Sequence, residues 1–560
     1  MKQESNPGLH TSTGRRPRRR APQTDARPRA HAPASPRVSF TRASACLLLS
    51  ACCLLFLAAC GRRGDSFVTV LDTNPATLDQ LRGTDAASER LRQLMFNSLV
   101  RKNERFEYVG ELASDIKTST DGHTVTFTLR EGVTFHDGRP LTSADVKYTL
   151  DTLLASDSPK AGSFYEATPQ GRQPLVTAVE AADARTVVFR LRRPWPQLLS
   201  NLVSFGIIPQ GSAAQQAQEP LGSGPFRFVS RDESQQVVDM EAHETYWDGA
   251  PHIKKLRVRA IPEPSTLQAE LRSGGVDLAV AANLSPDAVN ELGNVPDLKI
   301  EKFPGANVVY ISFNAESEFV KDARLRRAVA HAIDREALVR DLLRGQATVA
   351  NSILPEESWA YAPGQAFTYD PEAAKRLLDE AGMRDPDGDG PQMRLPRPVS
   401  FKISPLGRQY AAVIQDMLKN VGIPANIESF EAPTLLDQLR KGQFQMTTAR
   451  WVGGNQDPIF LRDLFHSANI PPNGSGFNRG RYRNYDLDPI LDQAADTPPD
   501  EQRERARDLY RQAQEIITRE VPMLPLWYPA NMAVSRKNVG NIKINAGGDF
   551  GFLAKVTVEQ

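Results

Sequence analysis

The residues best suited to hold a metal ion are the histidines. The chain has eight of them, and six follow residue 60, at positions 123, 136, 243, 252, 331 and 466. No two have the i, i+2 spacing of a strand or the i, i+4 spacing of a helix that would bring two imidazoles to one ion. The cysteines are confined to one window, Cys46, Cys52, Cys53 and Cys60, so the chain beyond it has neither a thiolate ligand nor a disulfide. The sequence predicts no metal site.

A second candidate for ion binding is the stretch "DPDGDG", in which Asp385, Asp387 and Asp389 alternate as at the start of a calcium-binding loop. Such a loop requires a bidentate glutamate at its twelfth position, which here is Pro396. We therefore interpret the stretch as an exposed acidic turn.

Nucleophilic and phosphate-binding patterns fail as well. Ser223 in "LGSGPF" and Ser475 in "PNGSGF" have no glycine two residues earlier, which a nucleophile elbow requires. No glycine run is followed by a Walker lysine. The sequence predicts a protein that is not an enzyme and has no cofactor, so any ATP hydrolysis would belong to a partner.

The stretch with the strongest binding character is "ARWVGGNQDPIF", residues 449–460. Gly453 and Gly454 would allow another main chain to come close, and the Trp451 indole offers a large flat surface. The alternative for Trp451 is a core tryptophan. Arg450 is either a clamp on a carboxylate or phosphate or a solvated surface arginine.

The elements that must position such a loop are mixed helices and strands. Thr142 with Asp145 predicts a capped helix start, and "DPEAAKRLLDEAG" predicts a helix capped by Asp370, opened by Pro371 and ended by Gly382. The pattern in 322–345 predicts one amphipathic helix ending at Gly345, with a single apolar face that comprises Leu325, Val329, Ala332, Ile333 and Leu342.

One strand pattern occurs twice. In "HTVTFTLR", Val125, Phe127 and Leu129 alternate with threonines, as in a half-buried strand. The same pattern returns 62 residues later with Val187, Phe189 and Leu191. This predicts a hairpin-like unit that is used twice, within an α/β chain long enough for more than one lobe.

The charge divides the chain into two parts. Residues 1–59 carry ten Lys or Arg against two Asp or Glu, which leaves 58 against 65 for the rest. An acidic body argues against a nucleic-acid partner. The Arg-, Pro- and Ala-rich segment before residue 43 is predicted to be disordered. Either the start codon is placed too far upstream, or the segment belongs to a twin-arginine signal. The apolar run 43–59 is shorter than a membrane span and follows Arg37 and Arg42, as in a secretory signal.

The end of that run, "LAACG" at 57–61, resembles the bacterial lipoprotein box. This resemblance implies cleavage before Cys60 and acylation of Cys60, with several chains giving a stable anchor. Lipidation and an ordinary signal peptide remain the alternatives, as do the inner and the outer membrane.

The body resembles the large peptide- and nickel-type solute-binding proteins of bacterial ABC importers, family 5, from about Asp72 to Pro529. Segments that carry the resemblance, in the family's order, are "LDTNPATLDQL", "LVRKNERFEYVGELASDIKTSTDGHTVTFTLREGVTFHDGRPLTSADVKYTL", "GSGPFRF", "VYISFNAESEFVKDARLRRAVAHAIDREAL", "AAKRLLDEAG" and "VPMLPLWYPAN".

The resemblance implies an α/β fold with two lobes, similar to periplasmic binding proteins of type II and cluster C, with an extra subdomain in the first lobe. We expect a basic extension and signal at 1–59, a linker at 60–65, the first lobe at 66–305, the second at 306–519 and a return to the first at 520–560. The segments "FPGANVVYISFN" and "VPMLPLWYPAN" would cross between the lobes, and the lobes would close by a hinge.

The resemblance also places the 449–457 loop on the wall of the cleft, where its backbone would pair with an extended ligand. The expected solute-binding residues are Arg450, Trp451, Gly453, Gly454, Asn455 and Asp457, with Asn74 and Thr77 from the facing lobe. Peptide-binding members carry an aspartate for the ligand's amino group where this chain has Gly454. Either Asp457 or another carboxylate substitutes, or the solute lacks a free α-amine. His136 in "FHDG" corresponds to a turn motif.

Taken together, these features predict an extracytoplasmic, lipid-anchored monomer in the cell envelope. It would capture a peptide or peptide-like small-molecule solute and deliver it to an ABC permease with its ATPase subunits. The alternatives are an envelope hydrolase on a similar scaffold and a ligand sensor that is not coupled to transport.

Overall fold

The computed structural model describes residues 65–168, 171–280, 283–388, 390–453, 456–498 and 502–559. The predicted signal segment and Cys60, the predicted lipidation site, lie outside these residues, as do Gly454, Asn455 and Asp389. Residues 65–560 form one unit that contains two large sheets. Among the described residues, none of the helices combines the length and apolar character that a membrane crossing needs.

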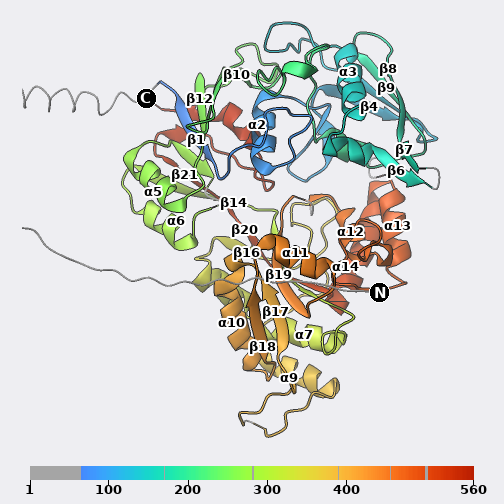
Figure 1. Ribbon diagram of the computed structural model, residues 1–560, viewed down its shortest axis with the longest axis vertical. Coiled ribbons are helices and arrows are strands. Elements are labelled where there is room, and N and C mark those ends of the chain that lie inside the picture. Colours follow the sequence, from blue (N-terminus) through green and yellow to red (C-terminus); the bar gives the residue numbers. More distant parts are fainter. Residues whose placement is uncertain are drawn as a thin grey trace, which may run out of the picture. The chain divides into compact units, whose positions relative to one another are not determined.

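The first large sheet has seven strands in the order β10-β11-β12-β1-β13-β21-β14 (Figure 1). Strand β1 is parallel to both of its neighbours, whereas the outer pairings are antiparallel. Phe67, Val70 and Leu71 of β1 are buried, because helices and loops cover both faces of a central strand. The strand bounds are β1 (Phe67–Leu71), β10 (Phe226–Asp232), β11 (Val237–Ala242), β12 (Lys255–Ala260), β13 (Leu278–Val280), β14 (Leu298–Phe303) and β21 (Asn531–Arg536).

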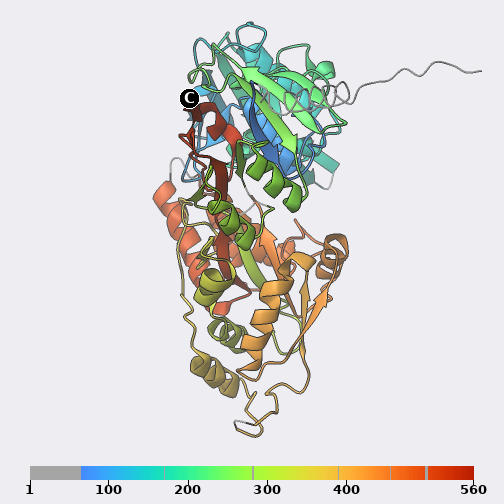
Figure 2. The same cartoon turned by 90° about the vertical axis from the view of Figure 1, so that its left-hand side faces the viewer.

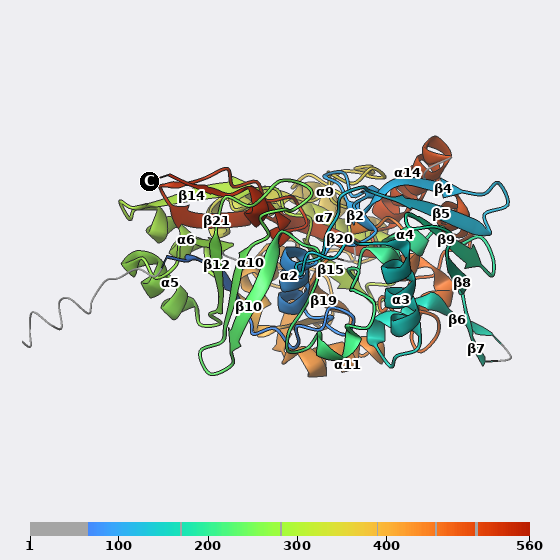
Figure 3. The ribbon, with the colours of Figure 1, turned by 90° about the horizontal axis from the view of Figure 1, so that it is seen from above.

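A four-stranded antiparallel sheet in the order β4-β5-β9-β8 lies on the other side of α2 (Ala86–Met95), as Figure 3 shows. Its two hairpins are β4 (Ala113–Thr118) with β5 (Thr124–Leu129), and β8 (Val176–Ala181) with β9 (Thr186–Leu191). Strands β5 and β9 pair at the centre, and the rings of Phe127 and Phe189 meet edge-on at 5.1 Å. The repeated hairpin predicted from the sequence is confirmed.

The second large sheet has six strands in the order β16-β20-β15-β19-β17-β18. Strand β15 is buried along its whole length between β19 and β20. In Figure 2 this sheet and its helices lie below the seven-stranded sheet, in a separate part of the molecule. The strand bounds are β15 (Val308–Phe313), β16 (Ala347–Val349), β17 (Val399–Ile403), β18 (Ala425–Ser429), β19 (Met446–Trp451) and β20 (Met523–Pro529).

The two sheets define two lobes. The first lobe comprises the seven- and four-stranded sheets, and the second comprises the six-stranded sheet; each has its own large apolar core. The chain passes between them at 304–307, between β14 and β15, and again at Ala530, between β20 and β21 (Figure 1). Strand β20 therefore belongs to the second sheet, and the return to the first lobe begins about ten residues beyond the expected boundary at 520.

The remaining elements fill the faces and edges of these sheets. Helices of the first lobe are α3 (Ser143–Leu154), α4 (Leu198–Leu202), α5 (Pro264–Ser273) and α6 (Pro286–Gly293). Helices between β15 and β20 in sequence are α7 (Ala323–Ala332), α8 (Arg335–Ala337), α9 (Pro371–Glu380), α10 (Arg408–Lys419), α11 (Ala432–Arg440), α12 (Phe460–Phe465), α13 (Asp488–Asp496) and α14 (Arg503–Glu520). Two-stranded ribbons are β2 (Val100–Lys102) with β3 (Tyr108–Gly110), β6 (Tyr165–Thr168) with β7 (Gly171–Pro174), and β22 (Val539–Gly540) with β23 (Thr557–Val558).

The two predicted helix starts are confirmed, but the single long helix predicted for 322–345 is not. The Asp145 carboxylate accepts the Thr142 backbone N–H at 2.9 Å, and the Asp370 carboxylate accepts that of Ala373 at 2.8 Å. The single helix predicted for 322–345 is wrong, because α7 ends at Ala332. There the Asp334 side chain accepts the Ala337 N–H at 2.8 Å, which starts a new helix.

Candidate functional site

The largest cavity described has a volume of about 720 Å³ and is lined almost entirely by the first lobe. Its walls come from α2, β2, the segment around α4, the loop 246–248 and the C-terminal segment 543–555. One residue of the second lobe, Gln456, completes the lining. This volume is within the usual range for a small-molecule site, roughly 300–1,000 Å³.

Helix α2 presents a polar face to the cavity. Its cap is Asp85, which accepts the Ser88 N–H at 2.9 Å, while Leu91, Leu94 and Met95 are buried in the core. Glu89, Arg92, Gln93 and Phe96 line the cavity because positions three and four apart share one side of a helix.

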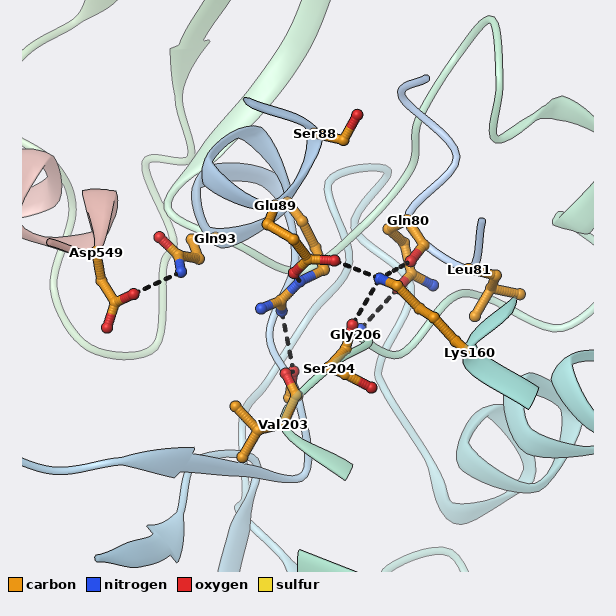
Figure 4. A network of polar contacts seen from close by, with 12 residues as sticks. Gln80, Leu81, Ser88, Glu89, Gln93, Lys160, Val203, Ser204, Gly206 and Asp549 are labelled. Carbon is orange, nitrogen blue, oxygen red and sulfur yellow. Dashed lines mark hydrogen bonds and ion pairs between the residues drawn. The ribbon is translucent and has the colours of Figure 1, made fainter. Parts of the chain in front are cut away.

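A buried ionic network holds this helix in place. Glu89 accepts the Arg92 Nε–H at 2.7 Å and lies 2.5 Å from the Lys160 ammonium, as Figure 4 shows for Lys160. Lys160 also donates to the carbonyl oxygens of Gln80 and Ser204, at 2.8 and 2.7 Å. Burial lowers the pKa of Lys160, and Glu89 opposes that shift. Three acceptors around one buried ammonium fix the helix against its surroundings.

The C-terminal segment is joined to α2 by one glutamine. Gln93 Nε2 donates to Asp549 at 2.9 Å (Figure 4). Gln93 Oε1 accepts the Phe550 N–H at 2.8 Å. Asn545 donates to the other Asp549 oxygen at 2.8 Å. Residues separated by more than 450 positions thus form one wall of the cavity.

Asn97 organises another part of the wall. Its amide donates to Glu111 at 2.8 Å and to the Tyr246 hydroxyl at 3.0 Å, and its oxygen accepts the Trp247 indole N–H at 3.2 Å. Glu111 also accepts the Ser98 N–H at 2.7 Å, and burial raises the pKa of this carboxyl. Within this wall, two aromatic rings are held at the cavity by hydrogen bonds.

Two contacts connect the lobes beside the cavity. The Lys102 ammonium donates to Gln456 Oε1 at 3.0 Å, and the Tyr108 hydroxyl donates to Asp457 at 2.5 Å. Burial lowers the pKa of Lys102, and burial, with the negative charge of Asp457, raises that of Tyr108. The second Asp457 oxygen accepts the Ile459 N–H at 3.0 Å, so both oxygens are engaged within the chain.

The structure separates the residues predicted for the site. Asp457 lines a neighbouring cavity of about 60 Å³ together with Tyr108. Gly453 has φ +78° and faces open space, so a side chain there would be strained rather than blocked. Arg450 is exposed and is not among the residues that line the large cavity. Gly454 and Asn455 lie outside the described residues.

Trp451 packs within the second lobe. Its ring stacks on Tyr310 at 6.1 Å, meets Phe460 and Phe477 edge-on, and lies under the Arg479 guanidinium at 5.5 Å. It lines a cavity of about 20 Å³, and its indole N–H has no acceptor among the described residues. This arrangement is that of a half-buried core tryptophan.

Asn74 and Thr77 occupy the loop between β1 and α2. Asn74 is exposed, and Thr77 accepts the Asp79 N–H at 3.0 Å and donates its own N–H to Ser88. Neither residue is among those that line the large cavity.

The other candidates singled out in the sequence have structural positions. His136 lies in a tight turn where the backbone bridges Thr134 and Pro140; it contacts the Gly224 carbonyl at 3.1 Å and meets the His243 ring edge-on at 5.1 Å. In the acidic turn, the exposed Asp387 accepts the Gln392 N–H at 3.1 Å, and Asp385 lies 3.7 Å from Arg394.

Sequence reasoning missed most of the cavity. Asn97, Glu111, Arg130, Trp247, Lys543 and Asp549 line it, and their segments are distant in sequence. The one local signal is the aromatic pair Tyr246-Trp247 before an Asp-Gly turn.

Comparison with known proteins places this geometry among binding proteins. The family model described as "Bacterial extracellular solute-binding proteins, family 5 Middle" matches residues 107–472. The chain is 26% identical to the oligopeptide-binding protein AppA of Bacillus subtilis over 513 residues, covering 87% of this chain and 90% of AppA. It is 27% identical to heme-binding protein A of Haemophilus influenzae, over 83% of this chain and 86% of that protein.

A third relative is the dipeptide-binding protein of Escherichia coli, which is 27% identical over 82% of this chain and 88% of its own length. The solved structure of Bacillus subtilis AppA in complex with a nonapeptide superposes with a TM-score of 0.66 at 25% identity, covering 88% of this chain and 99% of that one. The likeness therefore extends over both lobes.

Proposed function

Because the chain belongs to the bacterial extracellular solute-binding proteins of family 5, we propose that it captures a peptide or peptide-like solute and delivers it to an ABC permease. The observation that carries the proposal is the cavity of about 720 Å³ between α2, β2, the C-terminal segment and Gln456 of the second lobe. The relatives named for binding oligopeptides, dipeptides and heme support this solute class. The proposed solute is rich in amide groups, or is comparable in size to these ligands.

The proposed mechanism is binding energy used for lobe closure. Gln456 and Asp457 stand on the second lobe and contact Lys102 and Tyr108 on the first. A solute that contacts both sides of the cavity stabilises the closed form over the open one, and the permease recognises the closed form. On this proposal the chain performs no covalent chemistry.

The proposed location is the outer side of a membrane. The family is extracellular, and we extend this to a lipid anchor at Cys60 on the basis of the "LAACG" sequence. Radiolabelled palmitate incorporated into the full-length chain, and lost in Cys60→Ser, would support the anchor. An unlabelled full-length chain would contradict it.

The solute-binding proposal is tested with the chain from residue 61 onward, purified from its host without refolding. Native mass spectrometry should detect a bound small molecule, and a library of short peptides should raise the melting temperature. A protein that carries no guest and responds to no peptide would refute the proposal. Conversion of a captured molecule into a product would instead favour the hydrolase alternative.

A further inference from the structure

The charged residues that line the large cavity are mainly basic, although the body of the chain is acidic. Six Lys or Arg side chains line it against four Asp or Glu, whereas residues 60–560 carry 58 basic against 65 acidic side chains. A cavity whose charge is opposite to that of its surroundings concentrates ions of one sign.

Most of the carboxylates in this lining are already neutralised or bound. Glu89 contacts both Arg92 and Lys160, and Asp248 lies 3.3 Å from the Lys555 ammonium. Glu111 accepts N–H donors from Asn97 and Ser98, and burial raises its pKa toward the neutral form. Asp549 is held by the amides of Gln93 and Asn545.

The cations of the lining are less fully paired. The side chains of Arg101 on β2 and Lys543 after β22 form no hydrogen bond or ion pair with any described residue. The Lys102 ammonium donates to Gln456 and is also attracted by the carboxylates of Asp457 and Asp549. Arg130 donates to the Glu111 carbonyl at 2.5 Å, and its guanidinium lies 4.9 Å from the Trp247 ring centroid. Arg101, Lys543 and Arg130 therefore line the cavity without an ion pair to a carboxylate.

Two amide side chains of the lining have little capacity left. Gln93 and Asn97 use both their oxygen and their nitrogen within the chain. The guanidinium and ammonium donors of Arg101 and Lys543 remain, and they carry positive charge. Such donors form their strongest bonds with carboxylate oxygens, and Arg does so in two-pronged geometry.

We propose, resting on the solute-binding function above, that the cavity selects a peptide-like solute with net negative charge, and that Arg101 and Lys543 bind its carboxylates. The Trp247 ring, backed by the Arg130 guanidinium, is the flat surface for the remainder of the solute. Cationic solutes are rejected because they would face Arg101, Lys543 and Arg130.

The test uses the chain from residue 61 onward and N-acetylated tripeptides that differ in the central side chain and in the C-terminal group, and thereby in charge. The probes are N-acetyl-Ala-Glu-Ala as the free acid, N-acetyl-Ala-Gln-Ala amide and N-acetyl-Ala-Lys-Ala amide, titrated calorimetrically at low ionic strength. The diacid should bind at least about a hundred-fold more tightly than the neutral peptide, since each charge-assisted bond contributes about ten-fold or more. The cationic peptide should bind most weakly.

The double variant R101Q/K543Q should lose about a hundred-fold in affinity for the diacid and little for the neutral peptide. The matched control R384Q/K419Q removes one Arg and one Lys that are exposed on the second lobe and outside the cavity lining, and should bind like the parent chain. Equal circular dichroism spectra and melting temperatures would exclude misfolding of the variants.

The outcomes separate the two proposals. Peptide binding that is independent of charge, or equal losses in the variant and its control, overturns the anionic selection and leaves the solute-binding function standing. No binding by any peptide, together with no co-purified guest in native mass spectrometry, overturns both. In a competition experiment, inorganic phosphate and acetate are each added to displace the diacid. If phosphate does so at a lower concentration than acetate, the cations bind a phosphate group, and the carboxylate assignment is overturned.

Discussion

The contact between Tyr108 and Asp457 gives a sharp test of lobe closure. The Tyr108 hydroxyl on β3 donates to a carboxylate of the second lobe at 2.5 Å, and Arg503 pairs with Glu107 on the same side at 2.6 Å. Substituting Tyr108→Phe removes the donor and keeps the ring. A hydrogen bond to a charged group is worth about 1.5–3 kcal/mol, and Asp457 would lose one of its two partners.

How this loss appears depends on when the contact forms. If it forms only on closure, the whole 1.5–3 kcal/mol opposes the closed state, and solute affinity falls by about 10- to 150-fold. If it exists in the open form as well, affinity is unchanged and the loss appears in the free energy of unfolding. Calorimetric titration with N-acetyl-Ala-Glu-Ala and urea unfolding of the unliganded chain distinguish the two cases.

A matched control is Tyr165→Phe. The Tyr165 hydroxyl donates to the Leu154 carbonyl at 3.0 Å within the first lobe, so its loss changes stability without crossing between lobes. Y108F should weaken binding more than Y165F does, and small-angle scattering should show a larger radius for Y108F in the presence of solute. Equal affinities in the two variants would refute the role of Tyr108 in closure.

Three further predictions concern stability. Burial lowers the pKa of His243 and lowers that of His136 to about 3, so these histidines take up protons in the unfolded chain at a higher pH than in the folded one. The free energy of unfolding should therefore fall below pH ~6.5, by up to about 1.4 kcal/mol per pH unit per histidine. In urea unfolding at pH 4.5–7.5, H136Q should flatten this slope. Lys160→Met leaves the Glu89 carboxylate without its buried ammonium partner and should lower the free energy of unfolding by about 3–5 kcal/mol. Adding E89Q should restore part of this loss, whereas full stability of the single variant would contradict the role of the network. Asp145→Ala removes the carboxylate of the α3 capping box and should lower stability by about 1–2 kcal/mol, whereas K147A on the exposed face should have almost no effect.

The local rules of the sequence predicted those parts of the fold that depend on neighbours in the chain. Asp370, Pro371 and Gly382 bound α9 because a cap, a fixed φ and a left-handed turn all act within a few residues. The repeated strand pattern likewise predicted two hairpins, since alternation alone decides which side chains face the core.

The break after α7 shows where such rules conflict. Apolar spacing favoured one helix, but Asp334 competes for backbone N–H groups and the buried Arg335 donates to the carbonyls of Ala350, Pro525 and Phe367. Those acceptors lie up to 190 residues away. A helix boundary set by long-range partners cannot be read from periodicity.

The cavity was beyond sequence reasoning for the same reason. Helix α2 and the C-terminal segment meet in its wall through Gln93 and Asp549, and no local pattern marks either residue. The 449–460 stretch was identified because glycines and an indole stand close together, yet Trp451 packs into its own lobe. Residue type indicated a special loop but not the direction in which its side chains point.

The position of Asp457 connects the loop to the proposed solute. One of its oxygens accepts from Tyr108 and the other from the Ile459 backbone, so an ammonium group of a solute would have to share this carboxylate with two donors of the chain. In the cavity beside it, Arg101 and Lys543 supply positive charge to carboxylates of the solute without competing with a contact between the lobes. A solute that presents carboxylates to the first lobe and no amine to the second therefore satisfies both sides, and the loop then serves closure rather than amine recognition.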